Sequence, residues 1–220
     1  GAPGTDLAVR YSLRAEELGA DAVMVIPPNA PPTTSAQVRE YYRRISDAIG
    51  VPIFIQDITG ASVAPPLAVQ IARESENACY AKVETPPTPP RVAEARAVGG
   101  ADLVVFGGAG GSFLLEELRR GSSGTMPGCA IPEVFRRVWD LFEAGKEVEA
   151  ASEFDRYIPL LKQLGQGLGI ANHLTKEVLR LRGVFKSARV RHPAVAPDDT
   201  AYREIREAVE SLELGVIGTV

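Results

Sequence analysis

Lys82 is the residue whose position most strongly indicates chemistry. It lies within the apolar run 79–83, and lysine is rarely buried because its ammonium is costly to remove from water. Burial favours the neutral amine, which is a nucleophile toward carbonyl carbons. The alternative interpretation is a lysine that pairs with Glu84 or Asp57, or one that extends out of the end of a strand.

Polar side chains follow two of the apolar runs. Gln56 and Asp57 come directly after the run 51–55, and Glu84 lies two residues beyond Lys82. A spacing of two places Glu84 and Lys82 on the same face of a regular strand. Sheets and barrels of the α/β class hold their sites at the carboxyl ends of parallel strands. We therefore expect these polar residues beside Lys82, with a loop-capping Asp57 and a solvated Glu84 as the alternative.

A glycine-rich segment, 107–111, follows the apolar run 103–106. Such a segment between a strand and a helix can hold phosphate groups, but this one lacks the GxGxxG spacing of dinucleotide-binding loops. It also lacks the lysine and hydroxyl residue of a P-loop. The better interpretation is that small residues permit a tight turn and leave room above a pocket.

Short apolar runs alternate with helical patterns over the first 130 residues. The runs are continuous, which is typical of parallel strands covered on both faces. Helical patterns separate them, and Ser35 is the expected N-cap of one that ends near Ala48. The expected strands are residues 22–26, 51–55, 79–83 and 103–106, with a weaker one at 124–126.

The pattern changes after residue 130, where apolar residues recur at helical spacing and no strand is predicted. Helices are expected near 131–142, 147–164, 170–182 and 200–212. Alternating strands and helices indicate an α/β protein. Five parallel strands do not close a barrel, so periodicity alone also allows an open doubly wound sheet.

Composition and charge exclude several classes of protein. The chain has 220 residues, of which 45% are hydrophobic and 24% charged, with a net charge of −4. We expect a cytoplasmic protein without a nucleic-acid or membrane partner, because no basic cluster, long apolar run or signal peptide is present. The two cysteines and two histidines match neither a disulfide framework nor zinc spacing.

Four motifs together resemble the dihydrodipicolinate synthase / N-acetylneuraminate lyase family over nearly the whole chain. They are Gly19–Ala22, the segment 52–57, Lys82 within the segment 80–84, and the segment 124–127. The resemblance implies a (β/α)8 TIM barrel with a C-terminal helical extension, of which this chain lacks the first three βα units. Residues 1–130 would then form a partial barrel with strands four to eight. Residues 131–220 would form the last barrel helix and the extension.

The chain departs from the aldolases and synthases of this family at two places. They carry a tyrosine at the end of the fifth strand, where this sequence has Gln56, and the synthase's tyrosine pair after the fourth strand is replaced by residues 29–31. The segments 82–87, 106–108 and 124–127 look more like the branch of 2-keto-3-deoxy-L-arabonate dehydratases. A tyrosine proton shuttle is therefore not expected.

The resemblance implies a class I lyase that forms a Schiff base between Lys82 and a 2-oxo acid, dehydrating a 2-keto-3-deoxy sugar acid. The expected catalytic residues are Lys82, Gln56, Glu84 and Asp57, and the expected substrate-binding residues are Gly107, Gly108, Thr125 and Met126. No metal or organic cofactor is expected, and the family resemblance implies a homo-oligomer, a dimer or tetramer. The alternatives are a dihydrodipicolinate synthase or sugar-acid aldolase that uses pyruvate, and a non-catalytic relative.

Overall fold

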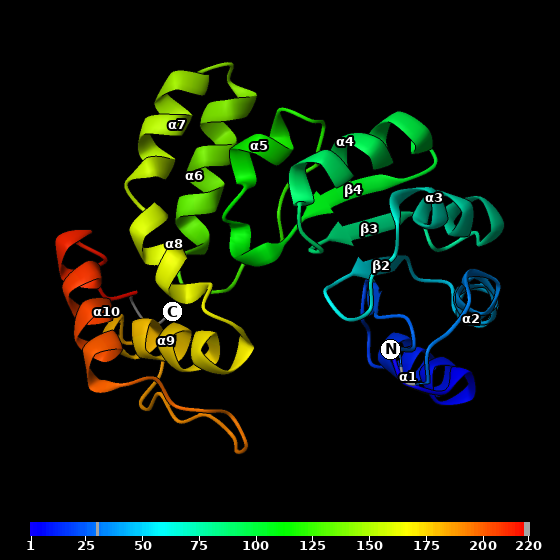
Figure 1. Ribbon diagram of the computed structural model, residues 1–220, viewed down its shortest axis with the longest axis horizontal. Coiled ribbons are helices and arrows are strands. Elements are labelled where there is room, and N and C mark those ends of the chain that lie inside the picture. The colour runs from blue at the N-terminus through cyan, green and yellow to red at the C-terminus, as the bar shows by residue number, and fades with distance from the viewer. Residues whose placement is uncertain (30, 218–220) are drawn as a thin grey trace. The chain divides into compact units, whose positions relative to one another are not determined.

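A computed structural model describes residues 1–29 and 31–217 of the chain (Figure 1). The loop position Ala30, at the expected tyrosine-pair site, lies outside the described residues. Four parallel strands form one sheet in the order in which they occur in the sequence. They are β1 (Val23–Val25), β2 (Ile53–Asp57), β3 (Tyr80–Val83) and β4 (Val104–Gly107). The α/β class and the four principal strands expected from the apolar runs are thus confirmed.

Helices connect the strands and, together with loops, make up the rest of the described chain. The helices before residue 127 are α1 (Thr5–Glu17), α2 (Ser35–Ser46), α3 (Pro65–Glu74), α4 (Thr88–Gly99), the short 3-10 turn η1 (Ala109–Gly111) and α5 (Leu114–Leu118). Those that follow are α6 (Pro132–Glu143), α7 (Glu147–Asp155), α8 (Ile158–Leu164), α9 (Leu168–Leu181) and α10 (Asp199–Ser211). The chain divides into two compact units, one of residues 1–109 and 113–126, the other of residues 110–112 and 127–220.

In place of the expected fifth strand, the structure has one isolated β-bridge. Within residues 124–126, Thr125 forms an isolated parallel bridge with Gly107. Gly107 donates its N–H to the carbonyl of Gly124 over 2.9 Å and accepts from the N–H of Met126 over 3.1 Å. The segment contains a glycine with φ of 142° and a proline follows it, and both residue types interrupt strand pairing.

The sheet has two faces of different character because successive residues of a strand point to opposite sides. On the face lined by helices α1 to α4 (Figure 1), Ile53, Ile55 and Val105 are fully buried. On the other face, the rings of Phe54 and Tyr80 stack with centroids 4.6 Å apart. That face is half-buried rather than covered, and its Met24 is 38% exposed.

Helix α2 begins at Ser35, one residue earlier than it would if Ser35 were its N-cap. Thr34 is the N-cap: its hydroxyl accepts from the N–H of Gln37, and the side chain of Gln37 accepts from the N–H of Thr34. The expectation that Ser35 caps this helix is therefore wrong. Thr34 caps the helix instead because Gln37, three residues later, completes a reciprocal capping box with it.

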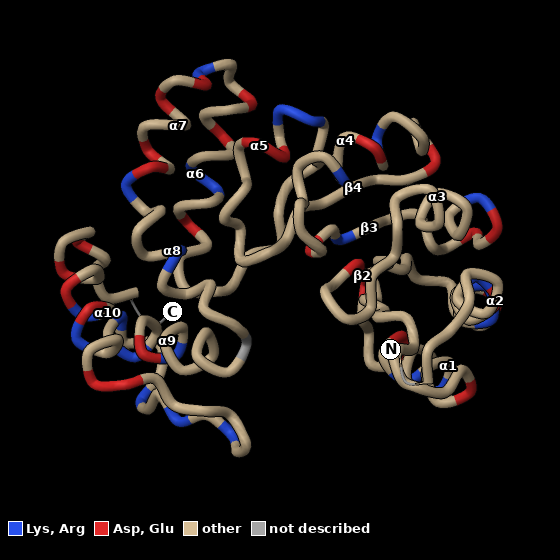
Figure 2. The backbone as a smooth tube through the Cα atoms, in the orientation of Figure 1, with Lys and Arg blue, Asp and Glu red and all other residues tan. Residues whose placement is uncertain are grey.

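The second unit consists of helices and loops in its described part. Arg182, at the end of α9, is 5% exposed and donates to the carbonyl of Ala130 and to Glu133 over 2.6 and 2.5 Å. Figure 2 shows acidic and basic residues interspersed along the helices. No helix in the described residues combines the length and the apolar content needed to cross a membrane.

Candidate active site

Strands β2 and β3 bring three of the expected site residues together. Gln56 lies opposite Lys82 in the parallel register, and both are on the half-buried face of the sheet. The Nζ of Lys82 lies 3.2 Å from the Oε2 of Glu84, and the two side chains are each 14% exposed. Lys82 and Glu84 share this face because they are two residues apart at the end of one strand.

The Glu84 carboxylate has two further partners besides Lys82. The amide of Gln56 donates to Oε2 over 2.8 Å, and the backbone N–H of Ala109 donates to Oε1 over 3.1 Å. Ala109 has φ of 47°, a left-handed conformation that is costly for a residue with a Cβ. This backbone conformation aims an N–H at Glu84, so the loop after β4 helps to hold the carboxylate beside Lys82.

Two consecutive glycines at the end of β4 allow side chains to approach the backbone from both sides. A Cβ at Gly108 would overlap the Glu84 side chain, and a Cβ at Gly107 would overlap the carboxylate of Glu117. The small residues expected to leave room for a pocket therefore leave room for two carboxyl groups. No ligand contact tests Gly107, Gly108, Thr125 or Met126, and their role in substrate binding stays a prediction.

Asp57 is not part of the Lys82 cluster, in contrast to the expectation from its place in the sequence. It follows Gln56 by one residue, so its side chain lies on the helix-covered face, where it is 3% exposed. Its carboxylate accepts from four donors: Ser62 Oγ (2.9 Å), Val63 N (2.9 Å), Thr85 Oγ1 (2.7 Å) and Arg91 Nε (3.0 Å). These bonds fix the loops that follow β2 and β3.

Glu117 is a buried acid that the sequence analysis did not single out. It is fully buried on α5, and one carboxylate oxygen accepts from the hydroxyl of Thr88 over 2.5 Å. Burial raises the pKa of Glu117 to about 7. Its spacing of three residues from Leu114, on a helix with an apolar face, is the signal that could have placed it inside.

The described residues contain no group of three or more histidine, cysteine, aspartate or glutamate side chains arranged to hold a metal ion. The arrangement that they do contain is an amine held against a carboxylate, with an amide and a backbone N–H fixing that carboxylate. An amine so placed can add to a carbonyl, and the carboxylate can receive its proton.

A family model, the dihydrodipicolinate synthetase family, matches residues 1–212 of the chain. The chain belongs to this family. The membership expected from the motifs around Lys82 is therefore confirmed. Among curated members of the dihydrodipicolinate synthetase family, an L-2-keto-3-deoxyarabonate dehydratase of Azospirillum brasilense is 33% identical over 195 residues. That match covers 86% of this chain and 62% of the relative, so the chain spans less than two thirds of that protein's length.

Other members of the dihydrodipicolinate synthetase family match over a similar range. A probable mitochondrial 4-hydroxy-2-oxoglutarate aldolase of Emericella nidulans is 28% identical over 222 residues, covering 97% of this chain and 70% of the relative. The crystal structure of a dihydrodipicolinate synthase from Rhodopseudomonas palustris superposes with a TM-score of 0.85 and 31% identity. It covers 95% of this chain and 72% of that protein. The chain thus has the fold of the dihydrodipicolinate synthase TIM barrels over the part that it shares with them.

Proposed function

We propose that this chain belongs to a lyase that forms a Schiff base between Lys82 and a 2-oxo acid. The observation that carries the proposal is the position of Lys82: its Nζ is 3.2 Å from Glu84, on the half-buried face of the sheet. Gln56 and the Ala109 N–H hold the carboxylate in place. A nucleophile beside a base that is itself held by other groups is the arrangement that covalent catalysis requires.

The chemistry follows from the amine. Glu84 takes a proton from the Lys82 ammonium, and the free amine adds to C2 of the 2-oxo acid, where loss of water gives an iminium. The iminium withdraws electrons and makes the C3 proton acidic. Removal of that proton gives an enamine, which expels the C4 hydroxyl as water. Tautomerisation and hydrolysis release the product and restore the amine, so the net reaction is the loss of one water.

The residues of the cluster then have distinct roles. Glu84 is the proposed acid and base, because it is the carboxylate next to the amine. Gln56 is a positioning residue that acts through its hydrogen bond to Glu84. Asp57 has no proposed proton-transfer role, because Arg91 and three other donors occupy its carboxylate on the opposite face of the sheet.

A 2-keto-3-deoxy sugar acid is the proposed substrate class. The similarity to the Azospirillum brasilense dehydratase supports it, as does Gln56 at the place where the aldolases and synthases carry a tyrosine. If the substrate is the L-arabonate derivative, the product is 2-oxoglutarate semialdehyde.

The second candidate is an aldolase or synthase that uses pyruvate, which the similarity to the Emericella nidulans aldolase favours. Mass spectrometry of the products separates the two. With 2-keto-3-deoxy-L-arabonate, the dehydratase proposal expects a product lighter by one water. Release of pyruvate and an aldehyde would identify an aldolase instead, and the absence of any product or adduct would identify a non-catalytic relative.

We also propose that the protein forms a homo-oligomer, a dimer or tetramer. In the described part of the second unit, seven large apolar side chains are between 37% and 85% exposed: Val148, Ile158, Val184, Phe185, Val195, Val216 and Ile217. Exposed apolar side chains often mark surfaces for association. Light scattering should give a mass that is a multiple of the chain's 23.5 kDa, and a monomer at all concentrations would contradict this proposal.

A further inference from the structure

The Gly107–Gly108 segment separates two carboxyl groups. Glu84 packs on Gly108 at the half-buried face of the sheet, and Glu117 packs on Gly107 at the helix-covered face. In both places the neighbouring carboxyl occupies the space that a Cβ would need. The two glycines place no side chain between these acids, and the negative charge of Glu84 raises the pKa of Glu117.

Glu117 is only partly satisfied by hydrogen bonds. Thr88 donates to Oε1, whereas Oε2 is buried without a hydrogen-bond partner among the described residues. Thr125, which pairs with Gly107 in the parallel bridge, has a buried hydroxyl that is likewise unpartnered in the described part of the chain. A buried carboxylate with an unsatisfied oxygen is costly when charged, so this environment favours the protonated acid.

Burial and the neighbouring charges both raise the pKa of Glu117. Burial is the largest cause, the hydrogen bond from Thr88 lowers this pKa, the charges of Glu116 and Glu84 raise it, and the result is a pKa of about 7. The arginines of α4 have other partners: Arg91 binds Asp57, Ser62 and the Val63 carbonyl, and Arg96 binds the Gly100 and Leu103 carbonyls. Glu117 therefore changes its charge close to neutral pH.

Resting on the function proposed above, we propose that Glu117 is a positioning residue whose charge, acting across Gly107–Gly108, holds the proton on the Lys82 amine. A protonated Glu117 adds no charge at this segment. When Glu117 loses its proton, its negative charge stabilises the Lys82 ammonium on the other side of Gly107–Gly108, so less of the lysine is free amine.

The coupling predicts how imine formation depends on pH. More free amine forms as pH rises, but above about pH 7 the charge on Glu117 holds back this increase. Replacing the Glu117 carboxyl by an amide of the same shape should remove this limit on the amount of free amine. Near neutral pH and above, Glu117→Gln should trap pyruvate faster than the wild type by up to about tenfold, the effect of one unit of interaction between coupled groups. Below the range in which Glu117 ionises, the two proteins should react alike.

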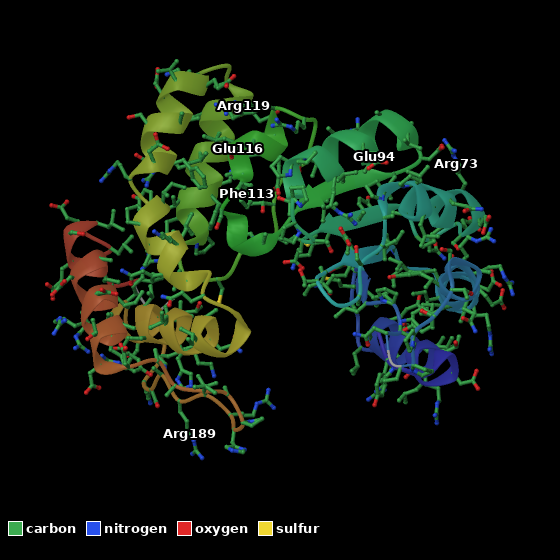
Figure 3. The ribbon with its side chains drawn as sticks, in the orientation of Figure 1. Arg73, Glu94, Phe113, Glu116, Arg119 and Arg189 are labelled. Carbon is green, nitrogen blue, oxygen red and sulfur yellow. The ribbon has the colours of Figure 1, made fainter. Side chains whose placement is uncertain are left out.

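The direct test is a pH titration of isotope-labelled glutamate carboxyl carbons by NMR, with Glu84→Gln used only to assign the Glu84 signal. We expect a step near pH 7 in the Glu84 signal of the wild type and its loss in Glu117→Gln. The matched control is Glu94→Gln, which removes an exposed carboxylate of α4 (Figure 3) and should retain the step. Absence of the step in the wild type, or its persistence in Glu117→Gln, would overturn the proposal.

A second variant tests the coupling without removing Glu117. Thr88→Val deletes the hydrogen bond that lowers the pKa of Glu117, so the step in the Glu84 signal should move to higher pH. An unmoved step would contradict the proposal. Borohydride trapping with pyruvate on the same samples separates this inference from the proposed function. A Glu84 step that depends on Glu117, in a protein that traps no 2-oxo acid, supports the coupling and refutes the lyase.

Discussion

Glu84 and Asp57 follow neighbouring strands, yet their carboxylates lie on opposite faces of the sheet. Asp57 pairs with Val83 in the register, one residue away from the pair of Gln56 with Lys82. This offset of one residue decides the role of each acid: Glu84 contacts the amine, and Asp57 forms an ion pair with Arg91 over 2.9 Å. We therefore expect the two acids to respond oppositely to mutation.

Asp57→Ala should destabilise the fold by about 3 kcal/mol, because it leaves the partly buried Arg91 without its carboxylate. Trapping of a 2-oxo acid per folded molecule should be retained. Glu84→Gln should show the reverse pattern, with near wild-type stability and strongly reduced trapping. Urea denaturation and borohydride trapping on both variants measure the two quantities. Loss of trapping in folded Asp57→Ala would show that the reaction requires the Asp57 carboxylate.

The raised pKa of Glu117 makes the stability of the protein depend on pH. Folding raises this pKa from its ordinary 4.5 to about 7, so the folded state binds the proton more tightly than the unfolded chain. The stability is therefore intact below the ordinary pKa and decreases as pH rises to about 7, by up to about 3 kcal/mol. Glu117→Gln should abolish this decrease.

Urea denaturation at about pH 5 and about pH 8 measures this effect as a difference between the two conditions. Any cost of burying the glutamine amide of Glu117→Gln is the same at both pH values and cancels. Glu94→Gln, on the exposed side of α4, should keep the wild-type dependence. Equal pH dependence in all three proteins would show that Glu117 does not titrate in this range.

At the scale of elements, the loop after β4 positions the site through its backbone. Gly108→Ala should displace Glu84, because the added Cβ overlaps that side chain, and should reduce trapping strongly. Gly128→Ala is the matched control: no heavy atom lies within 4 Å of a Cβ built there, and its φ is outside the left-handed range. Wild-type trapping by Gly108→Ala would mean that Glu84 need not stay beside Lys82.

Sequence patterns predict the strands and the faces of their side chains, but not every helix cap or contact between helices. Apolar runs located the four strands, because strands buried on the helix-covered face need β-branched residues there. The spacing of Lys82 and Glu84 predicts their shared face, and the same alternation within β2 places Asp57 on the opposite face from Gln56. The N-cap differed by one residue because Thr34 and Gln37 form a reciprocal pair. The partners of Glu117 depend on contacts between α4 and α5 that periodicity does not contain.

At the scale of the whole molecule, periodicity predicted the α/β class but not the barrel. The number of strands in this chain is compatible with an open sheet, and only the four motifs at 19–22, 52–57, 80–84 and 124–127 indicated the TIM-barrel family. The family match over residues 1–212 and the superposition on a dihydrodipicolinate synthase confirmed that expectation. The barrel fold was therefore predicted from the sequence motifs and not from the alternation of strands and helices.

Lys82 is the amine that we propose binds a 2-oxo acid. The four other lysines, 146, 162, 176 and 186, lie outside the strands. Lys82→Arg keeps a positive charge beside Glu84 but stays protonated and cannot form an imine. Lys82→Ala removes the amine, and Glu84 retains its bonds to Gln56 and Ala109, so both variants should fold.

The most direct measurement is the intact mass of the protein after incubation with 2-keto-3-deoxy-L-arabonate or pyruvate and reduction with borohydride. We predict one covalent adduct per wild-type chain, attached at Lys82, and no adduct on Lys82→Ala or Lys82→Arg with unchanged circular dichroism. An adduct that persists at full yield on folded Lys82→Ala would place the nucleophile at another residue and contradict the role of Lys82.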